Sequence, residues 1–457
     1  MGTGIIKPWT TLRTYNCGST MALGKDMSAE TPSVSHEPYW WDAAPREAPT
    51  DVALPRRCDI AVIGAGYAGL SAALTLARSG RSVVVLDAGA PGDGASSRSG
   101  GMIGHGHRLS YTKLIERFGS EKAKNLVREG MASLEFAKAL ITNEKIDAHL
   151  QLSGRMRGAW TLADYTTLAN DAAALRRDLG MPVDVLSKAD VRNEVATDFY
   201  QGGLLFRAHG GVHPALFHQG LLQSARAAGA LVVGHAAVIA LRRQADSYVV
   251  ETRRGGLRAA EVIATTNGYT GPATPALARR LVPIPSFLIA TEPLGESRVR
   301  ELIPNGRMIV ETRDKHLYYR PSPDGTRIVL GGRAALHPIT LDAASGWLRK
   351  ELCDIFPSLA NARVSHVWTG NVAMTRSDLP GIGQRDGIWY SLGCNGSGVA
   401  LMPYLGHKLA LKILRQPEGD TAFDDIPFAA VPFYNGTAWF RPLMTWWFRA
   451  RDELHRS

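Results

Sequence analysis

The sequence predicts an α/β fold built from two interleaved parts, one with a parallel sheet and one with a mixed sheet. Three observations predict it. Residues 58–87 read as two short apolar strands around a glycine-rich turn and a helix. Further strand-rich blocks return at 238–263 and 281–332. The chain has 457 residues, enough for two or three domains, and its 47 glycines suit a fold with many tight turns.

Composition excludes several classes of protein. Hydrophobic residues make up 45% and charged residues 21%, as in ordinary globular proteins. The net charge of +10 is spread over isolated arginine pairs, so we expect no nucleic-acid partner. The four cysteines form no C-x-x-C pair, we expect no bound metal, and no apolar run is long enough to cross a bilayer. We expect a cytoplasmic protein.

The first unit is a complete strand–turn–helix–strand. Cys58–Ile63 is an apolar run typical of a buried parallel strand, and Gly64-Ala-Gly-Tyr-Ala-Gly69 follows at once. Apolar residues then recur at helical spacing until Gly80, and Ser82–Leu86 is the second strand, with Asp87 at its end.

This G-x-G-x-x-G turn, in this context, predicts a Rossmann-like dinucleotide-binding site. Glycines let backbone N–H groups approach a pyrophosphate at the helix N-terminus, and an acidic residue about twenty positions later accepts the ribose hydroxyls. The alternative is a glycine-rich turn that binds no ligand. The residues expected to contact the cofactor here are Gly64, Gly66, Tyr67, Ala68, Gly69, Asp87 and Ala88.

The remaining elements follow in order along the chain. Residues 112–149 predict helices with a connection at Gly119-Ser120, and 160–198 predict short helices and turns. A helix over 214–228 ends at Gly229 and precedes a strand at 231–234. A helix over 343–356 stops at Pro357, and the last block, 364–414, ends in a long helix.

Further motifs carry a family resemblance. They are Gly94-Ala-Ser-Ser-Arg-Ser-Gly-Gly101, Ala264-Thr-Thr-Asn-Gly268, Trp368-Thr-Gly370 with Asp378-Leu-Pro-Gly381, and Gly393-Cys-Asn-Gly-Ser-Gly-Val399. Together with the first turn, the chain resembles the FAD-dependent D-amino-acid-oxidase superfamily, which includes glycine and sarcosine oxidases, and looks most similar to its gamma-glutamylputrescine oxidase branch.

The resemblance implies a Rossmann-like FAD-binding domain interleaved with a mixed β-sheet substrate domain. It implies that more residues contact FAD: Ser96, Ser97, Arg98, Ser99, Gly100, Gly101, Met102, Val238, Thr266, Asn267, Gly268, Gly370, Gly393, Asn395, Gly396, Ser397, Gly398 and Val399. The expected division is 57–110, 200–280 and 362–415 for the FAD domain, 111–199 and 281–361 for the substrate domain, 1–56 as an N-terminal extension and 416–457 as an aromatic, basic tail.

Four residues are candidates for catalysis. His105 and His107 follow the Gly100-Gly101 turn and can face the flavin, although a core or surface histidine is the alternative. The resemblance places Tyr319 and Arg333 in the sheet that covers the flavin, where they hold substrate or simply pack.

The resemblance implies oxidation of the C–N bond of an amine or amino-acid-like substrate to an imine, which hydrolyses to a carbonyl. Oxygen or a quinone would accept the electrons, and a flavin-binding subunit without turnover is the alternative. The attachment residues of related enzymes are missing, so FAD is expected to bind without a covalent bond. Ala400 stands where sarcosine oxidases carry a carboxylate-binding lysine, which favours an amine without an α-carboxylate. The tail, rich in Trp and Arg, can contact a membrane surface or pack on the protein.

Overall fold

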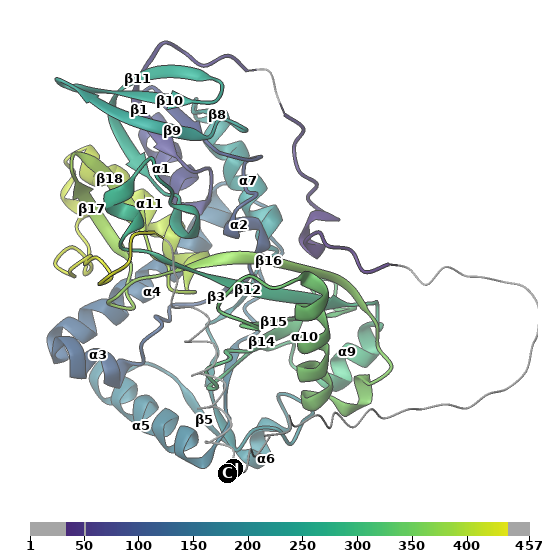
Figure 1. Ribbon diagram of the computed structural model, residues 1–457. Coiled ribbons are helices and arrows are strands. Elements are labelled where there is room, and N and C mark those ends of the chain that lie inside the picture. Colours follow the sequence, from purple (N-terminus) through teal and green to yellow (C-terminus); the bar gives the residue numbers. More distant parts are fainter. Residues whose placement is uncertain (1–32, 50–51, 437–457) are drawn as a thin grey trace, which may run out of the picture. The chain divides into compact units, whose positions relative to one another are not determined.

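The computed structural model describes residues 33–49 and 52–436 and has the predicted α/β fold. Two large sheets organise it, one towards the top of Figure 1 and one below. A third, two-stranded sheet pairs β3 (Met102–Ile103) with β7 (Gly210–Gly211). The protein therefore combines a nucleotide-binding type of sheet with a second sheet of different topology.

The first sheet is largely parallel. β1 lies in its centre, with β11 on one side and β2 on the other. Ile63 pairs with both Leu86 and Ala264, so these three strands end at one edge and Gly64, Asp87 and Thr265 follow there together. The strands are β17 (Gly381–Arg385), β18 (Ile388–Leu392), β11 (Gly255–Ala264), β1 (Arg57–Ile63), β2 (Val83–Leu86) and β8 (Leu231–Val233), with β10 (Ser247–Thr252) and β9 (Val238–Gln244) attached to β11.

Both faces of β1 are covered, which explains its unbroken apolar run. Ile60 and Val62 pack with α1, whereas Ala61 and Ile63 pack with residues of the β9–β11 meander. The helices on the first side are α1 (Tyr67–Arg78), α7 (Pro214–Ala227) and α11 (Gly398–Ile413), which lie together in Figure 1.

The second sheet is mixed, and its order is β16-β12-β15-β14-β13-β4-β6-β5. Alternate residues of its strands face opposite sides. Ile309 and Tyr319 pack with α10 in a hydrophobic core, whereas their neighbours Val310 and Tyr318 line a cavity. The strands are β16 (Val364–Met374), β12 (Val282–Thr291), β15 (Ile328–Gly332), β14 (Tyr318–Pro321), β13 (Met308–Glu311), β4 (Arg155–Ala159), β6 (Gly202–Phe206) and β5 (Asp184–Ser187).

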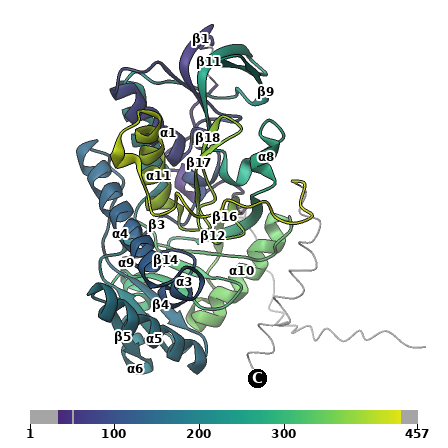
Figure 2. The ribbon, with the colours of Figure 1, turned by 90° about the vertical axis from the view of Figure 1, so that its left-hand side faces the viewer.

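Helices enclose the second sheet, as the two ribbon views show (Figures 1 and 2). α10 (Leu341–Ile355) contacts β12, β15 and β16. The remaining helices are α2 (Ala95–Arg98), α3 (Tyr111–Phe118), α4 (Ser120–Asn143), α5 (Leu162–Leu179), α6 (Lys188–Val191), α8 (Pro275–Ala278) and α9 (Glu296–Leu302).

One expectation about the helices needs correction. Residues 162–179 form one long helix, α5, instead of short helices and turns, because a Thr161–Asp164 capping box starts it and Gly180 ends it. β6 and β16 fall inside the residues expected for the FAD domain, but the structure pairs them with β4 and β12 of the second sheet. The division into two domains itself remains a prediction.

The segment before β1 packs on the protein body. Trp40 is fully buried, and the Trp41 indole donates a 2.9 Å hydrogen bond to Ser97. Of the C-terminal tail, the part up to residue 436 is described, and Phe423 and Phe428 are buried in it. The aromatic and basic residues from 437 onwards lie outside the described residues.

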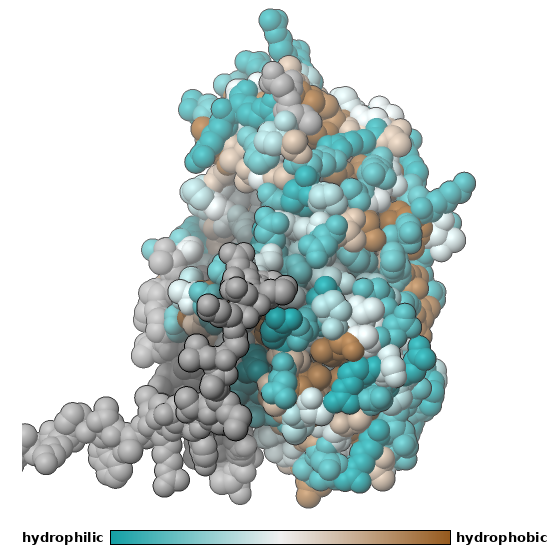
Figure 3. All heavy atoms as spheres, turned by 90° about the vertical axis from the view of Figure 1, so that its right-hand side faces the viewer, coloured by the Kyte–Doolittle hydropathy of each residue, from teal (hydrophilic) through white to brown (hydrophobic). Residues whose placement is uncertain are grey.

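No helix that could span a membrane occurs in the described part of the chain. None of its helices combines the length and the hydropathy needed to cross a bilayer. On the face in Figure 3 hydrophilic residues predominate and hydrophobic residues occur in small groups. Within these same residues no three His, Cys, Asp or Glu side chains come together as metal ligands.

Candidate active site

The glycine-rich turn lies between β1 and α1 at the carboxyl edge of the first sheet. Gly64 has φ +105°, which favours glycine, and lets the chain turn from the strand into the helix. A Cβ on Gly69 would lie 2.0 Å from the Gly64 carbonyl oxygen, and one on Gly66 would lie 2.9 Å from Ser96 Oγ. Only glycine fits at position 69, and a side chain at position 66 would displace the Ser96 hydroxyl, so the turn is tight enough for the close backbone approach that a pyrophosphate requires.

Asp87 stands beside this turn, as the spacing predicts. Its Oδ2 accepts a 2.7 Å hydrogen bond from the Ala65 N–H, and its Oδ1 accepts one of 3.1 Å from Gly89. Burial raises the pKa of Asp87, and these backbone donors oppose that rise. The carboxylate keeps further lone pairs for a diol, so the residues present fit the ribose and pyrophosphate of a dinucleotide.

Two predicted contacts use their side chains elsewhere. The Tyr67 hydroxyl donates to the Pro214 carbonyl and its ring packs on Phe217, so only the backbone of Tyr67 lies at the turn. Ser97 is fully buried, donates to Gly92 and accepts from Trp41. We therefore correct the expectation for the Ser97 hydroxyl, which the sequence could not orient.

The neighbours of Ser97 face the turn or the cavity. Ser96 Oγ accepts a 3.0 Å hydrogen bond from the Tyr67 N–H at the start of α1. Arg98 is held by the Asp93 carbonyl and stacks on Trp41, with 4.5 Å from Cζ to the ring centroid. The residues Arg98, Ser99, Gly100, Gly101 and Met102 all line the cavity described below.

Asn267 joins two motifs that lie 126 residues apart. Its Oδ1 accepts a 2.9 Å hydrogen bond from the Gly393 N–H and a weaker one from the Cys394 N–H. Asn395 is similarly engaged, since its Oδ1 accepts from the Thr375 N–H and its Nδ2 donates to the Gly393 carbonyl. Both asparagines thus hold the loop before α11 in place.

The other predicted cofactor residues occupy consistent places. α11 starts at Gly398 with no side-chain cap, so its N-terminal N–H groups remain available to a ligand. Ala88 is exposed just after β2, and Val238 begins β9, close to where Ala236 donates to the Asp87 carbonyl. Ala68 is buried against α11 and Thr266 and Gly268 lie in the turn after β11.

A cavity of about 620 Å³ lies between these motifs and the second sheet. Its wall on the nucleotide side includes Gly100, Gly370, Asn395, Gly396, Ser397, Val399 and Ala400. The opposite wall comes from β4, β12, β13 and β14, with α3 and α5 closing the side. Such a size suits a small organic ligand beside part of a bound cofactor.

The two predicted histidines differ in what they can do. His105 lines the cavity, and its ring lies 4.2 Å from that of His209. Burial lowers the pKa of His105 to about 3, so it is neutral at ordinary pH. His107 also lines the cavity: its Nε2 donates a 2.6 Å hydrogen bond to the Leu126 carbonyl, and its Nδ1 is buried without a partner among the described residues, so Nδ1 is the nitrogen left for proton transfer.

Tyr319 is the catalytic candidate that the structure moves away from the site. Its side chain is fully buried in the core with Phe356 and its hydroxyl lies 3.2 Å from that of Tyr200. The cavity is lined by Tyr318, whose hydroxyl lies 3.1 Å from Ser286 Oγ. Neighbouring residues of a strand face opposite sides of the sheet. The expectation was therefore wrong by one residue: Tyr318, and not Tyr319, faces the cavity.

Arg333 does line the cavity, and three residues that the sequence did not single out accompany it. They are Arg155 and Arg157 of β4 and His316 in the turn before β14. Burial lowers the pKa of Arg155 and of Arg333 to about 10 in each case, which leaves both charged at neutral pH. Burial, helped by the charges of Arg333, Arg108, Arg157 and Arg155, lowers the pKa of His316.

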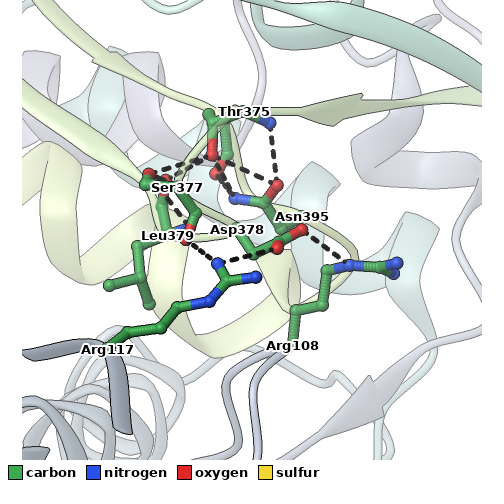
Figure 4. A network of polar contacts seen from close by, with 8 residues as sticks. Arg108, Arg117, Thr375, Ser377, Asp378, Leu379 and Asn395 are labelled. Atoms are coloured by element: carbon green, nitrogen blue, oxygen red, sulfur yellow. Dashed lines mark hydrogen bonds and ion pairs between the residues drawn. The ribbon is translucent and has the colours of Figure 1, made fainter. Parts of the chain in front are cut away.

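An ion-pair network closes one side of the cavity (Figure 4). Asp378 accepts hydrogen bonds from Arg108 Nε at 2.9 Å and from Arg117 at 3.2 Å. The turn that carries Asp378 is fixed by Thr375, whose hydroxyl donates to the Leu379 carbonyl and which contacts Asn395. The network links the segment after β3 to the loop before α11.

Comparisons with known proteins agree with this geometry. Residues 59–411 match the DAO family of FAD dependent oxidoreductases. The chain is 30% identical over 397 residues to the gamma-glutamylputrescine oxidoreductase of Escherichia coli, covering 86% of this chain and 92% of that protein. It is 29% identical over 423 residues to a probable oxidoreductase, OrdL, of Rhizobium meliloti, covering 91% and 97%. The crystal structure of glycine oxidase from Geobacillus kaustophilus superposes with a TM-score of 0.69 at 20% identity, over 83% of this chain and 99% of that one.

The fold and the site thus define a flavin-dependent oxidoreductase. The chain belongs to the DAO family of FAD dependent oxidoreductases, which confirms the family, the enzyme class and the FAD cofactor expected from the motifs.

Proposed function

We propose that the protein oxidises the C–N bond of an amine or amino-acid-like substrate in the cavity between the FAD motifs and the second sheet. The observation that carries the proposal is the composition of this cavity: Gly100 and Ser397 line one side, and Tyr318 and Arg333 line the other. When bound, FAD supplies the acceptor for a hydride equivalent from the carbon next to nitrogen, and the resulting imine takes up water to give a carbonyl compound and the free amine.

The residues of the chain would prepare both reactants. The N-terminus of α11, uncapped by a side chain, favours negative charge on the cofactor side of the cavity. An amine must be neutral to be oxidised, and the arginines of the opposite wall disfavour its protonated form. Tyr318 and Ser286 provide hydroxyls on the wall opposite the FAD motifs, and His105 contributes a neutral imidazole to the cavity lining.

The chain also supports a binding mode for FAD. We propose that Gly64, Gly66, Gly69 and Asp87 hold its dinucleotide half, and that the Gly100–Met102 and Gly396–Val399 segments border the ring, without a covalent bond. The role of Asn267 and Asn395 is to position the second of these segments.

Anaerobic mixing with a panel of amines and amino acids tests the function, because a substrate bleaches the bound flavin. Oxygen uptake compared with reduction of a quinone dye then separates an oxidase from a dehydrogenase. A cytoplasmic location remains part of the proposal, which fractionation of the source cells tests. Dithionite serves as the control, because it reduces any competent flavin. If dithionite bleaches the flavin but no amine does, the proposal is contradicted.

A further inference from the structure

Three arginines face the cavity without a partner. Arg155, Arg157 and Arg333 all line it, and each is only partly exposed. Their guanidinium groups form no hydrogen bond or ion pair with the described residues. Three unpaired cations on the wall of one cavity favour a ligand that brings negative charge into it.

Two other arginines of the cavity wall, Arg313 and Arg108, form ion pairs with carboxylates of the chain. Arg313 pairs with Glu311 at 2.7 Å and with Glu351 at 3.0 Å, and Arg108 pairs with Asp378. The chain itself therefore neutralises Arg313, and Arg108 shares the Asp378 carboxylate with Arg117. The contrast separates structural cations from cations that remain available to a ligand.

The carboxylates near the unpaired arginines accept hydrogen bonds from other residues or lie too far away to form an ion pair. Asp171 and Asp164 attract Arg157, but Asp171 accepts from the Thr112 N–H and Asp164 from Thr161 and Thr312. Asp314 and Asp378 attract Arg333 without an ion pair to it. Four arginines, Arg333, Arg108, Arg157 and Arg155, lie close enough to His316 to help burial lower its pKa.

Strand register places the unpaired arginines in two groups. Arg157 pairs with Val310, Val310 with Tyr318, and Tyr318 with Gly331. Three strand spacings separate Arg157 from Gly331, which is about 14 Å. Arg155 lies on the same face of β4 as Arg157, and Arg333 lies two residues beyond Gly331. One group is thus on β4 and the other beside β15, which is closer to the strand β16 that carries Gly370.

Resting on the proposed function, we infer that the substrate is an amine that carries two carboxylates. Arg333 holds the carboxylate nearer the cofactor motifs, and Arg155 with Arg157 holds the second one on β4. This replaces the expectation drawn from Ala400, because the cations that a carboxylate needs come from the second sheet instead of from α11. A carboxylate pairs with guanidinium through two parallel hydrogen bonds, which gives both charge neutralisation and orientation.

Binding of carboxylates without an amine tests the inference separately from the reaction. Flavin-loaded protein is titrated by calorimetry with α,ω-dicarboxylates from malonate to pimelate and with straight-chain monocarboxylates from propionate to heptanoate. We expect at least one dicarboxylate to bind at least ~10-fold more tightly than the monocarboxylate of equal carbon number. The chain length that binds best reports the distance between the two groups of arginines.

Substitutions of the arginines show which of them binds each carboxylate of the ligand. Arg157→Gln and Arg155→Gln are expected to remove the preference for the dicarboxylate, Arg157→Lys to keep part of it, and Arg333→Gln to weaken both ligand series. Arg207→Gln is the matched control, because Arg207 directly follows the neighbouring strand β6, is exposed and pairs with Asp184. Flavin content and circular dichroism show which variants are folded.

Equal binding of the two ligand series by the wild-type protein would overturn the inference, and so would a preference that survives in both Arg155→Gln and Arg157→Gln. Neither result depends on turnover. Bleaching by amines with no dicarboxylate preference would leave the proposed function standing and refute this inference alone. A dicarboxylate preference without any bleaching would support two carboxylate sites in the cavity and contradict the proposed function.

Discussion

Arg108 Nε donates a 2.9 Å hydrogen bond to Asp378 Oδ1 and thereby ties the segment after β3 to the turn between β16 and β17. Arg117 of α3 reaches the other oxygen of the same carboxylate. Asp378 is partly buried and has φ +58°, a backbone conformation that aspartate adopts less readily than glycine. The chain holds this residue at the cavity wall, where its single carboxylate serves both Arg108 and Arg117.

Asp378→Ala is expected to lower the free energy of unfolding by about 1 kcal/mol, since the pairs it removes are partly exposed. Urea denaturation of flavin-loaded protein measures this loss. Asp198→Ala is the control, because its pair with Arg192 is more exposed and neither residue lines the cavity. An equal effect of the two substitutions would contradict the role assigned to Asp378.

Gly66→Val is expected to weaken FAD binding. Its Cβ would lie 2.9 Å from Ser96 Oγ, and the branched side chain would fill the space that the pyrophosphate needs. Overpacking costs about 1–3 kcal/mol, which raises the dissociation constant of FAD about 5- to 150-fold. Fluorescence titration of the apoprotein measures it. Gly346→Ala, where an added Cβ meets no atom within 4 Å, is expected to leave FAD binding unchanged.

Asn267→Ala is expected to weaken FAD binding without contact to the cofactor. The substitution leaves the N–H of buried Gly393 without its acceptor, at a cost of about 1–3 kcal/mol. Thermal unfolding and FAD titration should both shift, whereas Asn193→Ala, at an exposed position, shifts neither. Unchanged FAD affinity in Asn267→Ala would show that the loop before α11 holds its shape without this clamp.

Acid should destabilise the protein through buried histidines. Burial lowers the pKa of His218 to about 4 from an ordinary value of 6.5, so the unfolded chain binds its proton first. The stabilisation is complete above pH 6.5 and is lost as the pH falls towards 4. The loss is about 3 kcal/mol at most for a shift of this size.

Unfolding free energies measured between pH 8 and 4 check this prediction. His218→Gln should flatten the decline, and His235→Gln, at an exposed site, should not. A decline of the same steepness in His218→Gln as in the wild type would contradict the assignment.

The sequence predicted the parts of the site that depend on local signals. The turn from Gly64 to Gly69, the helix after it and Asp87 lie within thirty residues, and their spacing alone determines how they meet. The arginine groups could not be found in this way. Arg155 and Arg157 reach the cavity because β4 pairs with β13, about 150 residues later, and only their spacing of two on a strand hinted at a shared face.

Two further features of the site could not be predicted from the sequence: which face of a strand a residue occupies, and which partner a side chain binds. Whether Tyr318 or Tyr319 faces the cavity depends on a single-residue phase that the sequence does not fix when both neighbours are aromatic. Ser97 has the residue type of a phosphate ligand, but Trp41, from a segment with no periodic pattern, occupies its hydroxyl.

The most direct measurement is anaerobic flavin reduction with product analysis. Flavin-loaded protein is mixed without oxygen with dimethylamine, N-methylglycine and iminodiacetate, which carry no, one and two carboxylates, and with longer dicarboxylic amines. The account predicts that the flavin bleaches, that one carbonyl product forms for each flavin reduced, and that the rate rises with the number of carboxylates. Bleaching that is absent with every amine, or fastest with the amine that has no carboxylate, would contradict it.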